Sequence, residues 1–199
     1  MKKIFKFSFV FLVIFVFGNF FTSTALAINN ASATISPTAA SLGENITYTY
    51  TVTNDSASTA NIGSAEIQLP TGFGTPSLSI SSAPSGKTWI LGSSDGYTNG
   101  FNSSTGKIGI KADGSSDKLD VSESVAIQIT VIAPSTAGSY EWTASSLANL
   151  GFTGTLFALT SAQPTVNITA PAPAPTSTFF IRNGDSVLYN GSVSLPNAG

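Results

Sequence analysis

The chain contains no cysteine and no histidine, and charged residues occupy only 9% of its 199 positions. Without cysteine there are no disulfides, thiolate metal sites, cysteine nucleophiles or lipobox lipid anchors. Without histidine the chain lacks the commonest general base and metal ligand, and a Ser-His-Asp triad is impossible. We therefore expect a domain held by its hydrophobic core, with no enzymatic activity and no cofactor.

Basic residues are scarce as well. Three of the eight lysines and arginines lie within the first six positions, which leaves five basic against ten acidic residues and a formal charge of −5. The remaining sequence contains no basic cluster, so nucleic acid and anionic membrane surfaces are not expected partners.

Residues 1–27 predict a secretory signal peptide. Lysines at positions 2, 3 and 6 precede the apolar run Phe7–Phe17, and Ala25 and Ala27 are the small residues that a signal peptidase reads. The run is shorter than the ~20 residues of a spanning helix, although an uncleaved N-terminal anchor is the alternative. We expect a secreted or extracellular cell-surface protein that contacts the membrane only through this leader.

The rest of the chain has the periodicity of β-strands. In Asn45–Thr53, Ile, Tyr, Tyr and Val alternate strictly with Thr, which predicts a half-buried strand. No helical periodicity of useful length follows the leader. Shorter segments of strand character are Ala31–Ser36, Ala65–Leu69, Leu78–Ile80, Trp89–Leu91, Ile108–Ile110, Val125–Val131, Tyr140–Ala144, Phe152–Leu156 and Val166–Ile168. Eight or nine short strands separated by Gly, Pro, Asn, Asp and Ser predict an all-β antiparallel sandwich over residues 28–169.

A change of composition marks the end of this domain. Residues 170–175 alternate Ala and Pro, which favours polyproline II and predicts a semi-rigid linker over residues 170–176. Beyond it, Thr178–Arg182, Ser186–Tyr189 and Ser192–Leu195 predict three short strands, with turns at residues 183–185 and at Asn190-Gly191. Because about twenty residues cannot form a core, we expect residues 177–199 to be the incomplete start of a second small β-rich domain.

Three segments resemble repeat modules of bacterial cell-surface and secreted proteins: Thr49–Asn54, Ile67–Phe73 and Ala133–Trp142. This resemblance implies an immunoglobulin-like sandwich in which Tyr140 forms a tyrosine corner and Trp142 stands where antibody domains have a cysteine. The opening of residues 177–199 is similar to the transcobalamin-type C-terminal domains that follow Pro-rich linkers in exported bacterial proteins.

Four acidic residues lie within eleven positions, which makes them the best candidate for a metal site: Asp113, Asp117, Asp120 and Glu123. Clustered carboxylates are suitable ligands for Ca²⁺. Their spacing does not match an EF-hand loop, however, and the alternative is a solvated turn before the next strand. We favour the turn and expect no bound metal.

Trp89, Tyr97 and Phe101 fall within a stretch rich in Gly and Ser. Aromatic side chains exposed on a sandwich face can stack on sugar rings, so these three are candidate ligand contacts. The alternative is that they pack into the core, where Trp is usually found.

Taken together, the sequence favours a non-catalytic structural spacer or adhesion module of an exported protein. The alternative is a carbohydrate- or protein-binding module with a specific ligand. In either case the expected partners are cell-envelope components, glycans or other surface proteins.

Overall fold

The computed structural model describes residues 28–171, 176–183 and 186–194. The predicted leader, with Ala25 and Ala27, and residues 172–175 of the predicted linker lie outside the described residues. Apart from one short 3₁₀ turn, η1 (Ser115–Asp117), all regular structure in these ranges is β-strand. No helix in these ranges is long and apolar enough to cross a membrane. The predicted all-β fold is confirmed.

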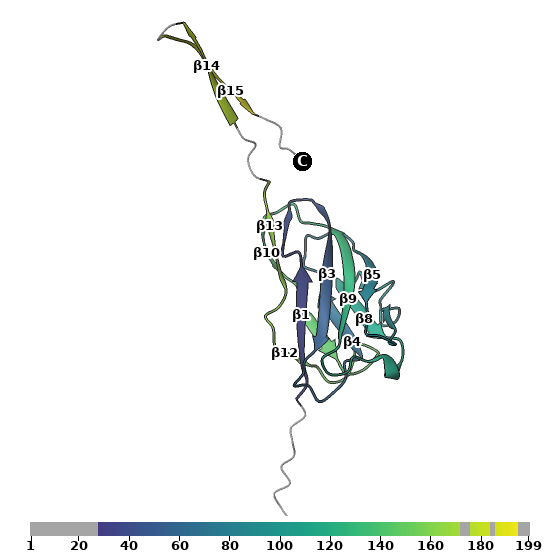
Figure 1. The fold of residues 1–199 in the computed structure, drawn as a ribbon. Coiled ribbons are helices and arrows are strands. Elements are labelled where there is room, and N and C mark those ends of the chain that lie inside the picture. The colour runs from purple at the N-terminus through teal and green to yellow at the C-terminus, as the bar shows by residue number, and fades with distance from the viewer. Residues whose placement is uncertain (1–27, 172–175, 184–185, 195–199) are drawn as a thin grey trace, which may run out of the picture.

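The strands form two facing sheets and a small third one (Figure 1). The first sheet has the order β12 (Ala158–Leu159), β1 (Asn30–Ser36), β3 (Asn45–Asn54), β9 (Ser124–Ile132) and β5 (Ser77–Ser82). The second has β11 (Ala144–Leu147), β4 (Ser64–Gln68), β8 (Lys107–Ala112) and β6 (Trp89–Leu91), with β7 (Phe101–Asn102) also paired to β8. The third has β10 (Gly138–Glu141), β13 (Thr165–Thr169) and β2 (Ala39–Ser41).

Strands β3 and β9 are the centre of the first sheet, and their alternating sequences explain why. Nine consecutive residue pairs join them, from Asn45↔Ile132 to Thr53↔Ser124. The inward side chains of Tyr48, Tyr50 and Val52 are at most 1% exposed, whereas the intervening threonines face outward. A slip of one residue would move every apolar side chain into water, so the buried face fixes this register.

Trp142 occupies the corner where the chain changes sheets. The sequence predicted one continuous strand through Tyr140, Trp142 and Ala144, and this is wrong. Tyr140 lies on β10, an edge strand of the third sheet, and Ala144 lies on β11 of the second sheet. Between these two strands the backbone N–H of Trp142 donates a hydrogen bond to the carbonyl of Pro164 at 2.8 Å. The fully buried indole of Trp142 enters the core.

Aromatic side chains pack around this corner. The Trp142 ring lies 5.5 Å from that of Tyr48 and 5.1 Å from that of Phe73, in edge-to-face geometry. The Tyr140 ring packs edge-on against Phe73 at 5.5 Å, and its hydroxyl donates to the carbonyl of Thr136 at 2.9 Å. This backbone-directed bond is the contact that defines a tyrosine corner. The corner therefore connects the third sheet to the aromatic part of the core.

Two further expectations about the sandwich are corrected. It has thirteen strands between residues 28 and 171 rather than eight or nine. The short strands β2, β7 and β12 were not predicted, and the segment Tyr140–Ala144 is divided between β10 and β11. Phe152 and Leu156 are not in a strand; they lie in the loop between β11 and β12, where Leu156 is 62% exposed. Strand β13 alone supplies the expected closing strand, with Val166 and Ile168 buried.

Beyond residue 175, β14 (Thr176–Asn183) pairs with β15 (Ser186–Ser194) as an antiparallel hairpin. The predicted turn at Asn190-Gly191 is wrong: these residues lie inside β15, opposite Phe180 and Phe179. A single long β14 pairs with both segments that were expected to form separate strands. Among the described residues, the two strands pair with each other and with no strand of the sandwich (Figure 1).

Candidate functional site

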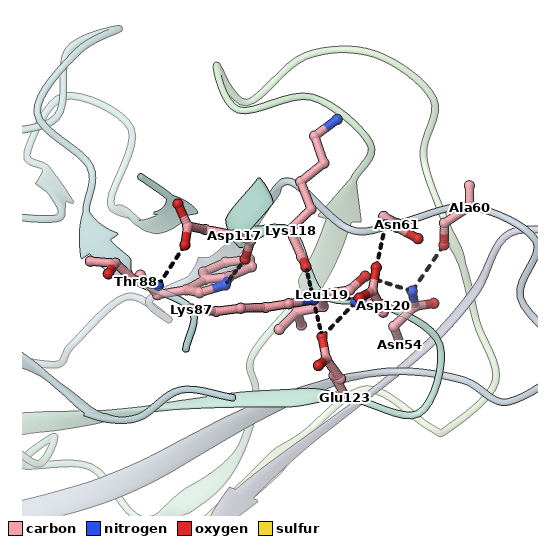
Figure 2. A network of polar contacts seen from close by, with 11 residues as sticks. Asn54, Ala60, Asn61, Lys87, Thr88, Asp117, Lys118, Leu119, Asp120 and Glu123 are labelled. Carbon is pink, nitrogen blue, oxygen red and sulfur yellow. Dashed lines mark hydrogen bonds and ion pairs between the residues drawn. The ribbon is translucent and has the colours of Figure 1, made fainter. Parts of the chain in front are cut away.

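Figure 2 shows a polar network built around Lys87, which lies in the loop between β5 and β6. Its ammonium group lies 2.7 Å from the carboxylate of Asp120 and 2.5 Å from that of Glu123, and it donates to the carbonyl of Lys118 at 2.6 Å. The Lys87 side chain is only 12% exposed. Two of the four candidate calcium ligands are therefore ion-paired to a lysine.

The surroundings of Lys87 and Asp120 keep both side chains charged. Burial lowers the pKa of Lys87, but the hydrogen bonds and charges of Asp120 and Glu123 outweigh burial, so the net pKa is raised. The bond to Lys87 lowers the pKa of the Asp120 carboxyl, and a smaller contribution comes from Asn61, which donates to it at 2.5 Å. Lys87 and Asp120 are consequently both charged at neutral pH.

The other two acidic residues point elsewhere. The Asp117 carboxylate accepts a bond from the backbone N–H of Thr88 at 2.9 Å, and Asp113 is exposed. Within residues 28–171 and the β14–β15 hairpin, no group of three or more acidic side chains is placed to hold a metal ion. The four residues therefore do not converge, and the loop is an ion-paired turn rather than a merely solvated one.

Asn54 connects this turn to the main sheet. Its side chain is fully buried at the end of β3 and donates to the carbonyls of Ala60 and Leu119, each at 2.9 Å (Figure 2). Its backbone N–H bonds to the carbonyl of Glu123 at 2.9 Å. These contacts give the network a structural role, because they close one end of the sandwich.

Trp89 and Tyr97 are buried, which agrees with the packing alternative for these aromatics rather than with an exposed platform for sugar rings. They are 4% and 6% exposed. The Trp89 indole faces the core, and its N–H donates to the carbonyl of Asp117 at 2.8 Å. Phe101, on β7, is half-buried beside a different cavity, so the three aromatics do not share one face.

Tyr97 instead takes part in a pocket on the outer face of the second sheet, where two loops cover the strands. Its ring lies 4.5 Å from that of Phe152, from the loop between β11 and β12. The two rings rest on Gly109 of β8, where an added Cβ would lie 2.8 Å from both. Glycine is thus required for this close approach.

A carboxylate forms the polar side of the same pocket. Glu66 of β4, whose side chain is 13% exposed, accepts a hydrogen bond from the Tyr97 hydroxyl and an ion pair from Lys107 at 3.0 Å. Burial, followed by the Glu66 hydrogen bond and charge, raises the pKa of Tyr97. The phenol therefore remains a neutral donor to Glu66.

The cavity beside these groups, here called the Tyr97–Phe152 pocket, has a volume of about 250 Å³. Asp95, Asn102, Thr105 and Thr153 also line it. Phe152 has a φ of 54°, a left-handed conformation that costs a residue with a side chain roughly 1–2 kcal/mol. Such strain is often found at binding sites. The pocket offers a partly exposed ring and a hydrogen-bonding rim, but no group positioned as a nucleophile.

Of this pocket, the sequence indicated Tyr97 alone. Glu66, Lys107 and Phe152 are separated from it by ten to fifty-five positions and carry no local motif. The single available signal was Gly109, which interrupts the alternation of β8 at a position where an ordinary outward-facing strand residue would have a side chain.

Known proteins show only distant similarity to this chain. No family model and no curated protein matches the chain. An immunoglobulin-like protein from Nocardia farcinica is 17% identical, with 71% of this chain and 99% of that chain covered and a TM-score of 0.44. A non-cellulosomal cohesin from Archaeoglobus fulgidus is 11% identical, with 72% of this chain and 91% of that chain covered and a TM-score of 0.41. A chain in a type I cohesin–dockerin complex from Clostridium thermocellum is 13% identical, with 72% of this chain and 95% of that chain covered and a TM-score of 0.39. The strand order of the structure itself shows an all-β sandwich; at these identities and TM-scores the likeness to immunoglobulin-like and cohesin structures carries no further argument.

Proposed function

We propose that this chain is a non-catalytic structural spacer or adhesion module of an exported cell-surface or secreted protein. The observation that carries the proposal is the path of the chain, which enters the sandwich at one end and leaves it at the other (Figure 1). Asn30 begins β1 beside β12, whereas Thr169 ends β13 beside Ser41 and Leu42, just before β3 starts.

The length of β3 sets the distance between entry and exit. Its ten residues run from the exit end back to the entry end, where Asn54 lies beside Ala31. At about 3.3 Å per residue, the two ends are roughly 30 Å apart. A domain with this geometry separates whatever is attached to its two termini, which is what a spacer must do. A core without disulfides does not depend on the redox state of its surroundings.

The export and spacer parts of the proposal are tested together. The exported product should have an intact mass that begins at Ile28, and it should be found in the envelope or the medium. Because the chain has no cysteine, labels at Ser56→Cys, an exposed residue just beyond β3 at the entry end, and at Ala170→Cys report the end-to-end distance specifically. A short distance between the labels, or a product that keeps its leader lysines and stays inside the cell, would overturn the proposal.

The second candidate function is a module that binds a carbohydrate or a small polar ligand through the Tyr97–Phe152 pocket. The strained backbone of Phe152 beside a hydrogen-bonding rim is the observation in its favour. A glycan array probed with the exported chain tests it. Phe152→Gly removes the ring and relieves the positive φ, so it should abolish binding while leaving the melting temperature nearly unchanged. Binding that survives this change, or no reproducible binding, excludes the candidate.

We also propose that residues 177–199 begin a second β-rich domain. The self-paired hairpin β14–β15 supports this, because two strands are marginally stable alone. Deletion of residues 176–199 should leave the melting temperature of the sandwich unchanged. A large drop would mean that the hairpin belongs to the first domain.

A further inference from the structure

The edge strands of the sandwich are protected to very different degrees. Five of the six sheet edges are formed by strands of only two to four residues, namely β12, β10, β2, β11 and β6. One of these, β10, also carries a charged residue, Glu141, which discourages pairing with another strand. The sixth edge, β5, is six residues long and has no charged side chain. One side of β5 pairs with β9, and in the described part of the chain no strand pairs with its other side. An edge of this kind presents backbone N–H and C=O groups that can accept another strand.

The usable part of this edge is short and well defined. Pro76 precedes it, and the pairing of β5 with β9 shifts register between Ile80 and Ser82. Ser77–Ile80 therefore form the regular segment, which is about 13 Å long. Along it, Ser77 and Ser79 are exposed, whereas Leu78 and Ile80 turn toward the core and are half-buried. An added strand would meet a hydroxyl face outside and an apolar face inside.

The inner side of this edge opens into a groove of about 560 Å³, the largest of the three cavities described along the sandwich surface. Leu78, Leu91 and Phe101 supply its apolar wall, and Thr98, Asn99 and Ser103 supply its polar rim. No charged residue lines it. Leu78 and Leu91 both pack closely on Gly100, where an added Cβ would lie 2.9 and 3.1 Å from them.

We propose that β5 and this groove form a docking site for an extended, uncharged peptide of a partner protein, which adds as a further strand to the first sheet. Backbone groups of the peptide pair with Ser77–Ile80. Every second side chain, an aliphatic one, enters the groove against Leu78 and Phe101, and the intervening small or hydroxyl side chains continue the outer face.

Both features of the site define the chemistry of this partner. A row of unpaired backbone donors and acceptors is matched by another main chain, and strand addition is a common mode of peptide recognition. The absence of charge in edge and groove would leave a charged peptide side chain desolvated without a partner. The proposal does not rest on the spacer role, because a sandwich that joins two domains in line still has this lateral edge.

A displayed library of random nonapeptides, panned against the exported full-length chain, is the direct test. We expect enrichment of uncharged peptides with aliphatic residues at alternate positions. The enriched peptides are then synthesised with a fluorescent label and titrated. Enrichment of charged or aromatic-rich peptides without alternation, or no enrichment, overturns the proposal.

Two variants place the binding at β5. Ser79→Lys puts a charge on the exposed face of the edge strand, as natural edge strands do, and Thr98→Trp fills the groove from its exposed rim. Both should weaken binding about tenfold or more. Ser139→Lys on the β10 edge is the matched control and should bind as the parent does.

The melting temperatures of all three variants should equal that of the parent, since the changed residues are exposed. Equal affinity in the parent, Ser79→Lys and Thr98→Trp overturns the site. A molar mass that doubles with concentration in the parent and not in Ser79→Lys would show that a second copy occupies the edge, and this overturns the assignment to a foreign peptide.

Discussion

The outer faces of the two sheets differ sharply. The face of the first sheet is open to solvent and its strands carry mainly hydroxyl and amide side chains, from Ser32 and Thr34 on β1 to Ser77 and Ser79 on β5. A carboxylate, that of Asp55, accepts a hydrogen bond from Ser32 at the edge of this face. The face of the second sheet carries Glu66, Lys107 and Lys111, and two loops cover part of it with the Tyr97–Phe152 pair. Water solvates the first face, whereas protein atoms replace water on part of the second. Substitutions on the two faces should therefore have very different costs.

The largest effect should come from the core that the two sheets share. Trp142→Ala removes the indole that packs against Tyr48 and Phe73, and we expect it to lower the free energy of unfolding by about 3–5 kcal/mol. Urea unfolding followed by circular dichroism measures this. A loss below about 1 kcal/mol would mean that neither sheet depends on this corner.

Gly109→Ala should have the next largest effect, confined to the covered face. The new methyl group would lie 2.8 Å from the rings of Tyr97 and Phe152, and overpacking of this kind costs typically 1–3 kcal/mol. Gly151→Ala is the matched control, because nothing lies within 4 Å of a Cβ at that position. Equal melting temperatures for the two variants would show that the loops do not pack on the second sheet as described.

Lys87→Met tests the ion-paired turn. The change keeps an aliphatic side chain but leaves Asp120, Glu123 and the carbonyl of Lys118 without their common donor. Because Glu123 and Asp120 are partly exposed, water replaces much of what is lost, and we expect a destabilisation of about 1–2 kcal/mol.

Addition of Ca²⁺ should not raise the melting temperature of the parent, since the four carboxylates of Asp113, Asp117, Asp120 and Glu123 do not converge on one point. A rise of several degrees would contradict the described geometry.

The same network predicts a pH dependence. The pKa of Asp120 is lowered in the fold, so its contribution is present above the unfolded value of about 4 and is lost as the pH falls through the folded value. The pKa of Lys87 is raised, so its contribution is present at neutral pH and is lost as the pH rises through the folded value. Melting curves from pH 2 to 11 should show both losses in the parent. If Lys87→Met showed the same two losses, the network would not be their cause.

Thr47→Ala should have the smallest effect, because it changes the open face. The Thr47 hydroxyl lies 2.7 Å from that of Thr130 across the strand pair, in a solvent-exposed position. Water can take over this bond, so we expect a loss below about 1 kcal/mol. If Thr47→Ala cost as much as Gly109→Ala, the open face would not differ from the covered one in the way proposed here.

Strands β3 and β9 were predictable because one side of each meets the core and the other meets water. That contrast produces the alternation of Ile46–Thr53 and Val125–Val131, and the observed strands follow it. The corner at Trp142 was not predictable, because an inward tryptophan has the same pattern in a continuous strand as at a change of sheets. The turn at Asn190-Gly191 failed for a related reason, since a local turn signal cannot report that a longer strand lies opposite.

The sites were less predictable than the fold. Lys87 lies more than thirty positions from Asp120 and Glu123, so the acidic segment read alone indicated either a metal site or a solvated turn. The sequence singled out Tyr97 as a candidate ligand contact, but the contacts it makes in the structure depend on Glu66 and Phe152, which reach it only after the sheet and the two loops have formed.

By itself, the sequence determined the all-β class, the buried side of each central strand and the exclusion of histidine and cysteine chemistry. These properties follow from composition and from a periodicity of two, which are local. Tertiary structure alone decided which carboxylates meet a lysine, which aromatics are buried and which edge strand is left without a partner. Each of these depends on residues that are distant in sequence and that the packing of two sheets brings together.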